Sequence, residues 1–581
     1  MLERNSAQVH AAAIQWLSQL QSAIAAGRED AIASLFVTDA WWRDIVCASW
    51  HIATVGERAA IAAAIVAADS QLREIALAED HPAPAMVQRA GRNCIELFFT
   101  FTTAHGSGTG VARLIGADDT WRCWTLMTAL DTLHQPQAES AESPPAPKSH
   151  SRDFRGPNWK DLRDQALAYT DRDPAVIEVG GGKEGLAIAA RLTALGVDTL
   201  IVDRESRIGD NWRLRYHALT LHNQTQVNHL PLMPFPKSWP LYIPKDKLAN
   251  WFEAYVEALE LNFWTDTDFT GGTYDEAAGH WTVTLNRRGE TITMRPRHVV
   301  MATGVSGIPN IPDIPALKGF EGPVLHSSQY TDGDDWTGKS AIIFGSGNSA
   351  HDIAQDLTSA GGHVTMVQRS PTLVVNIEPS AQLPYIIYSD GLSTEDCDLI
   401  AQATPFPIVR EMHRAYTRQS EALDKDLLDG LRAKGFRLTS GIDGTGWQFL
   451  YLTRGGGYYF NVGASDMIAE GRIDLIQHNE IEAFEPGAAK LTDGRTIPAD
   501  LVVLSTGYMP QEYVVERLFG PDVAGRVGAI WGFEQGGLEL RNMFCRTPQP
   551  GLYFIAGSLA QCRVYSKPLA VQIKAAELGI I

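Results

Sequence analysis

The chain has 581 residues, too many for one compact core, and its formal net charge is −19 at pH 7. A surface this acidic argues against nucleic acid or an anionic membrane as the main partner, because both are themselves negatively charged. The six cysteines form no C-x-x-C pair, so neither a zinc ribbon nor a thiol–disulfide centre is expected, and no metal site is predicted. The first residues lack a secretory-signal pattern, and the longest apolar stretch, at about 59–68, is far shorter than the ~20 residues of a membrane span. We therefore expect a cytoplasmic protein.

The first region, residues 1–134, combines helical and strand-like patterns. Apolar residues recur at helical spacing in 13–20, and several runs between 94 and 130 are rich in β-branched and aromatic residues. Helices followed by strands predict an α+β domain. Residues 135–158 are predicted to be a linker, because much of this stretch is Pro, Ala and Ser and cannot bury a core.

After the linker, the pattern strand, glycine turn, helix, strand occurs twice, at 175–203 and at 340–368. This alternation predicts an α/β architecture with parallel sheets and helical crossovers. A long insert at about 377–460 follows the second unit, and we expect it to shape the access of a ligand.

The first glycine turn contains Gly180, Gly182 and Gly185 in the spacing G-x-G-x-x-G, and Asp203 ends the strand that follows. The three glycines permit a tight turn, a close approach of the backbone to a pyrophosphate, and close packing of helix on sheet. The start of the helix offers unpaired N–H groups to the phosphates, and the carboxylate of Asp203 can accept hydrogen bonds from a ribose diol. This unit suits FAD.

Two acidic residues conflict with that prediction. Glu178 lies in a strand that should be buried, and Glu184 lies where the turn faces the phosphates. A buried unpaired carboxylate is costly, and a carboxylate beside a pyrophosphate is repulsive, although Lys183 can offset part of this. A protein that binds NADP(H) but has lost its flavin therefore remains an alternative.

The second glycine turn has Gly345, Gly347 and Ala350 in the spacing G-x-G-x-x-A, with Asn348 and Ser349 between them. The acid expected after the next strand is absent, and Gln368 and Arg369 stand there instead. An arginine can bind a 2′-phosphate, which an acid would repel, so this unit suits NADPH. A solvated surface charge is the alternative for Arg369.

Between the two units, Phe320, Gly322, His326 and Tyr330 fit the pattern F-x-G-x-x-x-H-x-x-x-Y. Together with the glycine turns, this resembles the class B flavin-dependent monooxygenases over about residues 170–581. The flavin-containing monooxygenases and plant-type indole-pyruvate monooxygenases are the most similar branches. The resemblance implies two Rossmann-like domains, with FAD bound by 159–335 and 501–581 and NADP by 336–500. It also implies that the signature couples NADP binding to domain movement, with His326 as a catalytic candidate.

The resemblance implies further contacts. In the segment after residue 216, His222 and Asn223 match the place where a side-chain donor stabilises a peroxide oxygen at the flavin face, so they are the main catalytic candidates. The other implied cofactor contacts lie in the motif at 207–213, at two strand ends, and near the C-terminus: Gly209, Trp212, Thr303, Gly304, Gly507, Gln561 and Lys567.

The first domain, with the run WWRDIVCASWHI, resembles the cone-shaped α+β fold of the nuclear-transport-factor-two and polyketide-cyclase-like proteins. A lid, an oligomerisation surface that would make a homo-oligomer, and a second binding pocket are all open roles for it, because a fold does not settle a function.

The activity implied is an FAD- and NADPH-dependent monooxygenase that uses dioxygen and a flavin 4a-hydroperoxide to oxygenate a small organic substrate. The expected reaction is N- or S-oxygenation of the N,N-dimethylaniline monooxygenase kind. Carbonyl-directed oxygenation, of the Baeyer–Villiger or indole-pyruvate type, is an alternative, and so is a flavin reductase without oxygenation.

Overall fold

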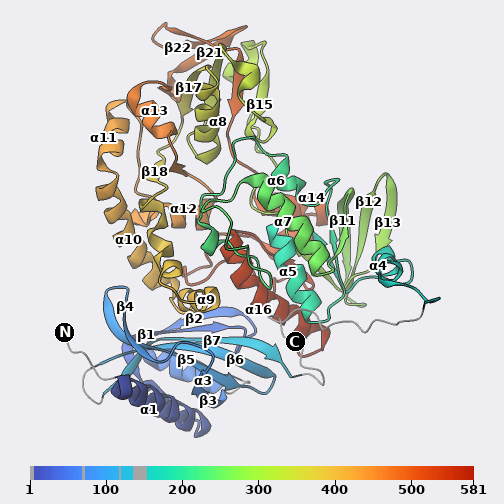
Figure 1. Ribbon diagram of the computed structural model, residues 1–581, viewed down its shortest axis with the longest axis vertical. Coiled ribbons are helices and arrows are strands. Elements are labelled where there is room, and N and C mark those ends of the chain that lie inside the picture. Colours follow the sequence, from blue (N-terminus) through green and yellow to red (C-terminus); the bar gives the residue numbers. More distant parts are fainter. Residues whose placement is uncertain (1–5, 69–71, 117–119, 135–153) are drawn as a thin grey trace.

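The computed structural model describes residues 6–68, 72–116, 120–134 and 154–581. Most of the predicted linker at 135–158 lies outside these residues. In Figure 1 the N-terminal domain lies at the bottom, and the two nucleotide-type units lie above it.

The N-terminal domain is a mixed sheet with helices packed against it. The sheet has seven strands in the order β2-β1-β7-β6-β5-β3, with β4 also paired to β5. Helix α1 buries Trp16, Leu17 and Leu20 against it, at the spacing that predicted the helix. The elements are α1 (Ser6–Ala25), α2 (Glu29–Ser34), β1 (Phe36–Ile45), β2 (Ile52–Gly56), α3 (Arg58–Ala67), β3 (Arg73–Leu77), β4 (Ala85–Arg89), β5 (Arg92–Thr102), β6 (Gly106–Ile115) and β7 (Arg122–Leu133).

The first nucleotide-type unit is a five-stranded parallel sheet in the order β10-β9-β8-β14-β25. Helices α5 and α16 pack against each other beside it, and a three-stranded antiparallel sheet adjoins it (Figure 1). The elements are α4 (Trp159–Ala168), β8 (Val176–Val179), α5 (Lys183–Ala194), β9 (Thr199–Val202), α6 (Asp210–Arg213), α7 (Lys245–Ala258), β10 (Asn262–Trp264), β11 (Thr267–Asp275), β12 (His280–Arg287), β13 (Glu290–Met294), β14 (His298–Met301), β25 (Leu552–Phe554) and α16 (Leu559–Glu577).

The second unit is also a five-stranded parallel sheet, in the order β15-β24-β16-β17-β20. Its elements are β15 (Val324–His326), β16 (Ser340–Phe344), α8 (Asn348–Ser359), β17 (His363–Gln368), α13 (Ala464–Glu470), β20 (Asp474–Gln477), β21 (Ile481–Glu485), β22 (Ala488–Leu491), β23 (Thr496–Pro498) and β24 (Leu501–Leu504). The predicted boundaries at 335/336 and 500/501 are wrong for two strands, because β15 and β24 both belong to this sheet. The reason is that chain order does not reveal strand pairing between segments about 175 residues apart.

The insert is mainly helical and joins the three parts. Helices α10 and α11 run along the left of Figure 1, and α9 lies above the N-terminal sheet. Its elements are β18 (Leu373–Asn376), η5 (Ser380–Ser389), α9 (Thr394–Gln402), α10 (Phe406–Leu423), α11 (Lys425–Ala433), α12 (Gly446–Arg454) and β19 (Tyr458–Asn461), with α14 (Gln511–Phe519) and α15 (Pro521–Val527) beyond it.

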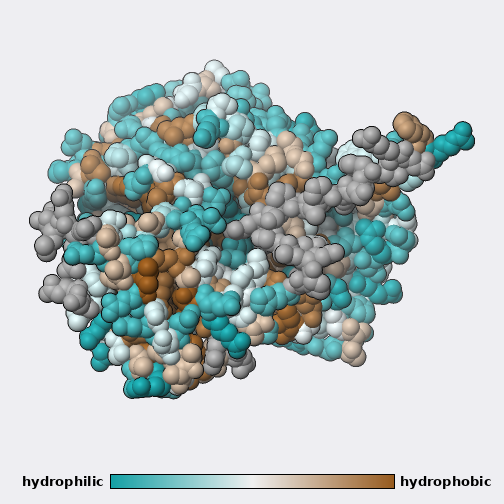
Figure 2. Space-filling model, turned by 60° about the horizontal axis from the view of Figure 1, so that its bottom comes forward, coloured by the Kyte–Doolittle hydropathy of each residue, from teal (hydrophilic) through white to brown (hydrophobic). Residues whose placement is uncertain are grey.

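One hydrophobic core crosses the border of the N-terminal domain. It includes the domain's own apolar residues together with Ile400 and Ala403 at the end of α9 and Val571 and Ala575 of α16. Figure 2, which brings this side of the molecule forward, shows hydrophobic patches separated by hydrophilic residues. None of the described helices is both long enough and apolar enough to cross a bilayer.

Candidate functional site

The first glycine loop has the geometry that its spacing predicts. Gly180 has φ +112°, and a Cβ atom there would lie 2.6 Å from the carbonyl oxygen of Ala302, so a glycine is required. Gly182 is the N-cap of α5, and the first N–H groups of that helix lack intrahelical acceptors. Asp203 holds the loop from the next strand, because its carboxylate accepts hydrogen bonds from the N–H groups of Gly181 (2.5 Å) and Glu205 (2.8 Å). The turn therefore has the form of an anion site.

The two acidic residues lie where they conflict with an anion. Glu178 is 0% exposed, and neither of its carboxyl oxygens has a hydrogen-bond partner among the described residues. Burial, and then the nearby charge of Glu184, raises the pKa of Glu178 well above its usual value. Glu184 forms an ion pair with Lys183 (2.6 Å), and its carboxylate lies 3.0 Å from where a Cβ of Gly182 would stand. One negative charge thus lies inside the glycine loop, partly balanced by a lysine.

The motif at 207–213 borders this loop. Gly209 is the N-cap of α6, and the ring of Trp212 lies 5.7 Å from the Lys183 ammonium. Asn211, which sequence reasoning missed, places its amide nitrogen 2.8 Å from where a Cβ of Gly182 would stand, and its buried amide oxygen has no partner among the described residues. The sequence indicated Asn211 only through its position inside the motif at 207–213. A buried oxygen at this place beside the loop can accept a hydrogen bond from a bound ligand.

The segments that follow the two strand ends contact each other, since the N–H of Asn310 donates to the carbonyl oxygen of Gly507 (2.9 Å), and the signature histidine contacts the second of them. Thr303 and Gly304 follow β14, and Gly507 follows β24. His326 Nδ1 accepts a hydrogen bond from the N–H of Ser328 (3.1 Å), so its protonated Nε2 donates to the carbonyl oxygen of Gly507 (3.0 Å). Burial lowers the pKa of His326. Both ring nitrogens bond to protein groups, so the ring ties the signature to the second strand end, and the catalytic role of His326 stays a prediction.

The two C-terminal candidates, Lys567 and Gln561, have different surroundings. Lys567 was expected beside the flavin, but its ammonium forms an ion pair with Asp131 of β7 (2.5 Å). The cause is that this part of α16 packs on the N-terminal sheet, which the sequence did not reveal. Gln561 remains close to the first unit's loops, and its amide oxygen accepts a hydrogen bond from the hydroxyl of Tyr451 (2.9 Å).

The second glycine loop repeats the geometry without the acids. Gly345 has φ +130°, and a Cβ there would lie 2.5 Å from the carbonyl oxygen of Ser505. Gly347 is the N-cap of α8, and Ala350, in the first turn of that helix, is fully buried. The side chain of Asn348 accepts a hydrogen bond from the N–H of Phe460 (3.0 Å), which fixes the insert to the start of α8. Ser349 lies between Asn348 and Ala350, in the first turn of α8.

A second arginine joins Arg369 at the end of β17. Arg369 is exposed, and its carbonyl oxygen accepts a hydrogen bond from the Arg437 guanidinium (2.5 Å). Gln368, at the position that Asp203 holds in the first unit, is buried and bonds both the N–H and the carbonyl of Arg437 (2.9 Å each). Arg437 was missed because it lies far along the chain, with no motif around it. The two arginines make this end of the sheet locally basic in an acidic protein.

The predicted catalytic pair faces the insert. The ring of His222 lies edge-on to Phe460 with centroids 5.5 Å apart, and burial lowers its pKa, so it is neutral at pH 7. The amide nitrogen of Asn223 donates to the hydroxyl of Tyr385 (3.4 Å). Trp447 lies 4.9 Å from Phe460 and 6.0 Å from Tyr385, between ring centroids. Three aromatic residues therefore cover the side of the pair that faces the insert.

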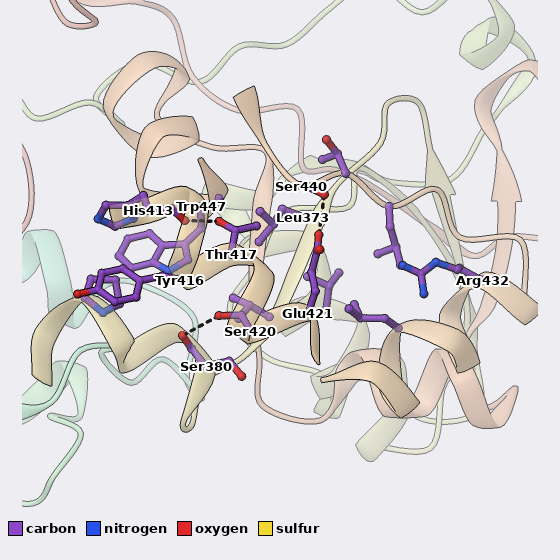
Figure 3. Close-up of a pocket in the computed structure, with 17 residues that line it drawn as sticks. Leu373, Ser380, His413, Tyr416, Thr417, Ser420, Glu421, Arg432, Ser440 and Trp447 are labelled. Atoms are coloured by element: carbon purple, nitrogen blue, oxygen red, sulfur yellow. Dashed lines mark hydrogen bonds between the residues drawn. The ribbon is translucent and has the colours of Figure 1, made fainter. Parts of the chain in front are cut away.

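Trp447 also lines a pocket of about 190 Å³ within the insert (Figure 3). Figure 3 shows Trp447, Tyr416 and His413 at one end, Arg432 at the other, and the hydrogen bond from Ser440 to Glu421 between them. Burial lowers the pKa of His413 to about 3, so it is neutral. The aliphatic wall consists of Leu373, Val374, Val375, Pro384, Leu428 and Leu438. The pocket thus has an aromatic end, an apolar wall and one carboxylate.

Comparisons with known proteins agree with this arrangement. A profile of the pyridine nucleotide-disulphide oxidoreductases matches residues 177–390. Indole-3-pyruvate monooxygenase YUCCA1 of Oryza sativa subsp. japonica is 30% identical over 344 residues, which are 58% of this chain and 77% of the relative. Probable indole-3-pyruvate monooxygenase YUCCA4 of Arabidopsis thaliana is 31% identical over 58% of this chain and 75% of its own.

Among solved structures, cyclohexanone monooxygenase from Rhodococcus sp. Phi1 bound to NADP⁺ aligns with a TM-score of 0.50 and 16% identity, over 70% of this chain and 85% of that chain. At this identity the likeness concerns the fold alone. Two parallel-sheet units, each opening on a glycine loop at a helix start, define a protein that binds two dinucleotides. The chain belongs to the flavin-dependent monooxygenase family that includes the indole-3-pyruvate monooxygenases, and it is an FAD- and NADPH-dependent enzyme.

Proposed function

We propose that this protein oxygenates a small organic carbonyl compound, and that 2-oxo acids are the first class to test. The observation that carries the proposal is the 30% identity over more than three quarters of a relative named an indole-3-pyruvate monooxygenase. This ranks the carbonyl reaction above the N- or S-oxygenation expected from the sequence, which stays as the second candidate.

Apart from Glu178 and Glu184, the residues present fit both cofactors. For FAD, the start of α5 at Gly182 would hold the pyrophosphate, and Asp203 would hold the ribose diol through its remaining lone pairs. The open loops at Gly304 and Gly507, and the unsatisfied amide oxygen of Asn211, border the same space. A bound flavin would supply two-electron chemistry and the activation of dioxygen.

For NADPH, the start of α8 at Gly347 would hold the pyrophosphate. Arg369 and Arg437 would bind the 2′-phosphate, with Gln368 orienting Arg437. Ser349 and Asn348 lie in the first turn of α8, next to the phosphates.

His222 and Asn223 would serve as neutral hydrogen-bond donors toward the reacting oxygen. A neutral imidazole can donate without adding a charge that must be desolvated, and the amide of Asn223 can exchange its long bond to Tyr385 for a ligand. Tyr385, Trp447 and Phe460 would exclude water from this side. The adjoining pocket would hold or admit the substrate's apolar body.

One observation favours the second candidate, oxygenation at an amine nitrogen. Among the described residues, Glu421 has the Ser440 hydroxyl as its hydrogen-bond donor, while Arg432 shares the carboxylate of Asp429 (2.7 Å) with Lys425. Because Glu421 has no cationic partner among the described residues and His413 is neutral, this carboxylate suits an ammonium group better than a 2-oxo acid.

The experiment begins with the visible absorption spectrum of the purified protein before and after adding FAD. NADPH oxidation and product formation are then followed in air with an aromatic 2-oxo acid, a cyclic ketone, N,N-dimethylaniline and a thioether. Product from the 2-oxo acid or the ketone supports the first candidate, and product from the amine or thioether alone supports the second. Absence of bound flavin at excess FAD contradicts both.

Glu421→Gln separates the two candidates further. If amines are the substrates, this change raises their KM by about tenfold, because a charge-assisted hydrogen bond is lost, and leaves KM for ketones unchanged. Glu411→Gln, an exposed acid on the same helix, is the matched control.

A further inference from the structure

Helix α9 lies between the N-terminal sheet and the rest of the molecule (Figure 1). Two buried arginines of that sheet bind its C-terminal end. Arg113 donates to the carbonyl oxygens of Ile400 (2.8 Å) and Ala403 (3.1 Å), and Arg43 donates to that of Gln402 (3.0 Å). The last carbonyls of a helix lack intrahelical partners and carry partial negative charge, so the two guanidinium groups satisfy and stabilise this end.

Each arginine is itself fixed by a buried carboxylate. Glu96 accepts from Arg113 (2.9 Å), and Glu539 accepts two hydrogen bonds from Arg43 (2.7 and 2.8 Å). The residues at the end of α9 also belong to the hydrophobic core of the N-terminal domain. A paired, desolvated and packed contact of this kind argues against a lid that opens, since opening would leave buried charges unpaired.

A second arginine link leads from α9 into the first nucleotide unit. Asp398 of α9 accepts two hydrogen bonds from Arg563 of α16 (2.8 and 2.7 Å). A third nitrogen of the same guanidinium donates to the carbonyl oxygens of Val227 (2.7 Å) and His229 (2.9 Å). Only a planar group with several fixed donors can bind a carboxylate on one edge and two carbonyls on another, which a lysine cannot do.

Val227 and His229 belong to the segment that starts at the predicted catalytic pair. The buried side chain of Asn228 donates to the carbonyl oxygen of Asn223 (2.8 Å), which closes residues 223–228 into a compact loop. Fixing the two carbonyls on either side of Asn228 therefore fixes the backbone of Asn223.

We propose that the N-terminal domain positions the His222–Asn223 segment, through α9, Asp398 and Arg563, and that Arg563 is a positioning residue. The path consists of contiguous buried hydrogen bonds. Weakening the contact between Arg113 and α9 therefore loosens the segment that contains His222 and Asn223. The assignment of His222 and Asn223 to the reaction rests on the proposed function, whereas the mechanical link does not.

The test is hydrogen exchange, read by mass spectrometry, on the full-length protein and its Arg113→Lys variant. A lysine keeps the charge beside Glu96 but cannot reach the two carbonyls of α9 as well. We expect exchange in 222–235 to be at least about tenfold faster in the variant, with β16 and β17 unchanged. Arg92→Lys, an exposed arginine of the same domain paired with Asp39, is the control and should change neither region. Faster exchange in α9 with no change in 222–235 would overturn the proposal.

Two further variants keep the test decisive if Arg113→Lys does not fold. Thr404→Val removes one acceptor of Arg113 (3.0 Å) and should give a smaller rise in the same segment, and Arg563→Lys should give a larger one. With a substrate in hand, Arg563→Lys should lower kcat and raise the NADPH consumed per product, while KM for NADPH stays unchanged. If no substrate turns over, the proposed function fails but the exchange result still decides the positioning role.

Discussion

The two glycine loops share a backbone and differ in charge. In each, the first glycine adopts a positive φ against the carbonyl of a neighbouring strand end, and the second caps the helix that follows. Yet the position two residues before the first glycine is Glu178 in one loop and Ile343 in the other. The position two residues after the second glycine is Glu184 in one and Ser349 in the other.

This difference shows that the conformation of the glycine turn and its affinity for a phosphate are separate properties. Backbone N–H groups and the helix start make the anion site in both loops, so both are recognisable by spacing. Side chains then set how strongly a phosphate is held, and the first loop carries a charge of the wrong sign that Lys183 partly offsets. Five substitutions would break or sharpen the comparison.

Removing Arg369 should have the largest effect on the second unit. Arg369→Ala should weaken NADPH binding by about 10–100-fold, because charge-assisted hydrogen bonds to the 2′-phosphate are lost, and leave NADH binding unchanged. Dissociation constants for both nucleotides, from fluorescence titration, check this. Arg472→Ala, an exposed arginine paired with Glu470, is the control. An equal loss for NADPH and NADH would exclude a 2′-phosphate contact.

Replacing Glu178 should stabilise the first unit. Glu178→Val removes a buried carboxyl that has no hydrogen-bond partner among the described residues, and it should raise the free energy of unfolding by about 1–3 kcal/mol, seen as a higher thermal midpoint. Because the folded pKa of Glu178 is raised, the wild-type protein loses stability as the pH rises from about 4.3, the usual pKa of a glutamate, toward the folded pKa. The gain from the variant should therefore be greater at pH 8 than at pH 5.

The matched change in the second unit is Ile343→Val, at the equivalent strand position. Deleting one methylene from this buried side chain should lower stability by about 1 kcal/mol, with no pH dependence. A Glu178→Val gain that did not vary with pH would mean that its carboxyl is not the source of the instability.

Introducing a glutamate into the second loop, at the position that Glu184 holds in the first, should reproduce the repulsion between a carboxylate and a bound phosphate. Ser349→Glu should weaken NADPH binding by about tenfold, because Asn348 stands where the first loop has the neutralising Lys183. Ser349→Gln, which has the size without the charge, separates repulsion from crowding. If both variants bind NADPH equally, the charge is not the cause.

The reverse substitution should have the smallest effect. Glu184→Ser should tighten FAD binding by only about threefold to fivefold, because the ion pair with Lys183 already cancels part of the repulsion. Titration of the deflavinated protein with FAD measures it, and high salt should reduce the difference between variant and wild type. Weaker FAD binding in this variant would mean that Glu184 and Lys183 act together as part of the site.

Much of the nucleotide sites could be predicted because their determinants are local. Gly180, Gly345, Asp203 and Arg369 follow from short spacings within a strand–turn–helix unit, and the comparisons support the two cofactors that these patterns indicated. The division of the chain into sheets was less predictable, since β15 and β24 reach the second sheet from either side of it in the sequence.

By itself, the sequence determined two glycine turns, the sign of the charge after each second strand, and the family. The tertiary structure decided which side chains those turns meet. In the folded protein the Arg437 guanidinium donates to the carbonyl oxygen of Arg369, and Lys567 forms an ion pair with Asp131. Both ring nitrogens of His326 form hydrogen bonds with protein groups. The physical reason is that backbone turns depend on neighbouring residues, whereas the partners of a long side chain depend on packing between segments that lie far apart in the sequence.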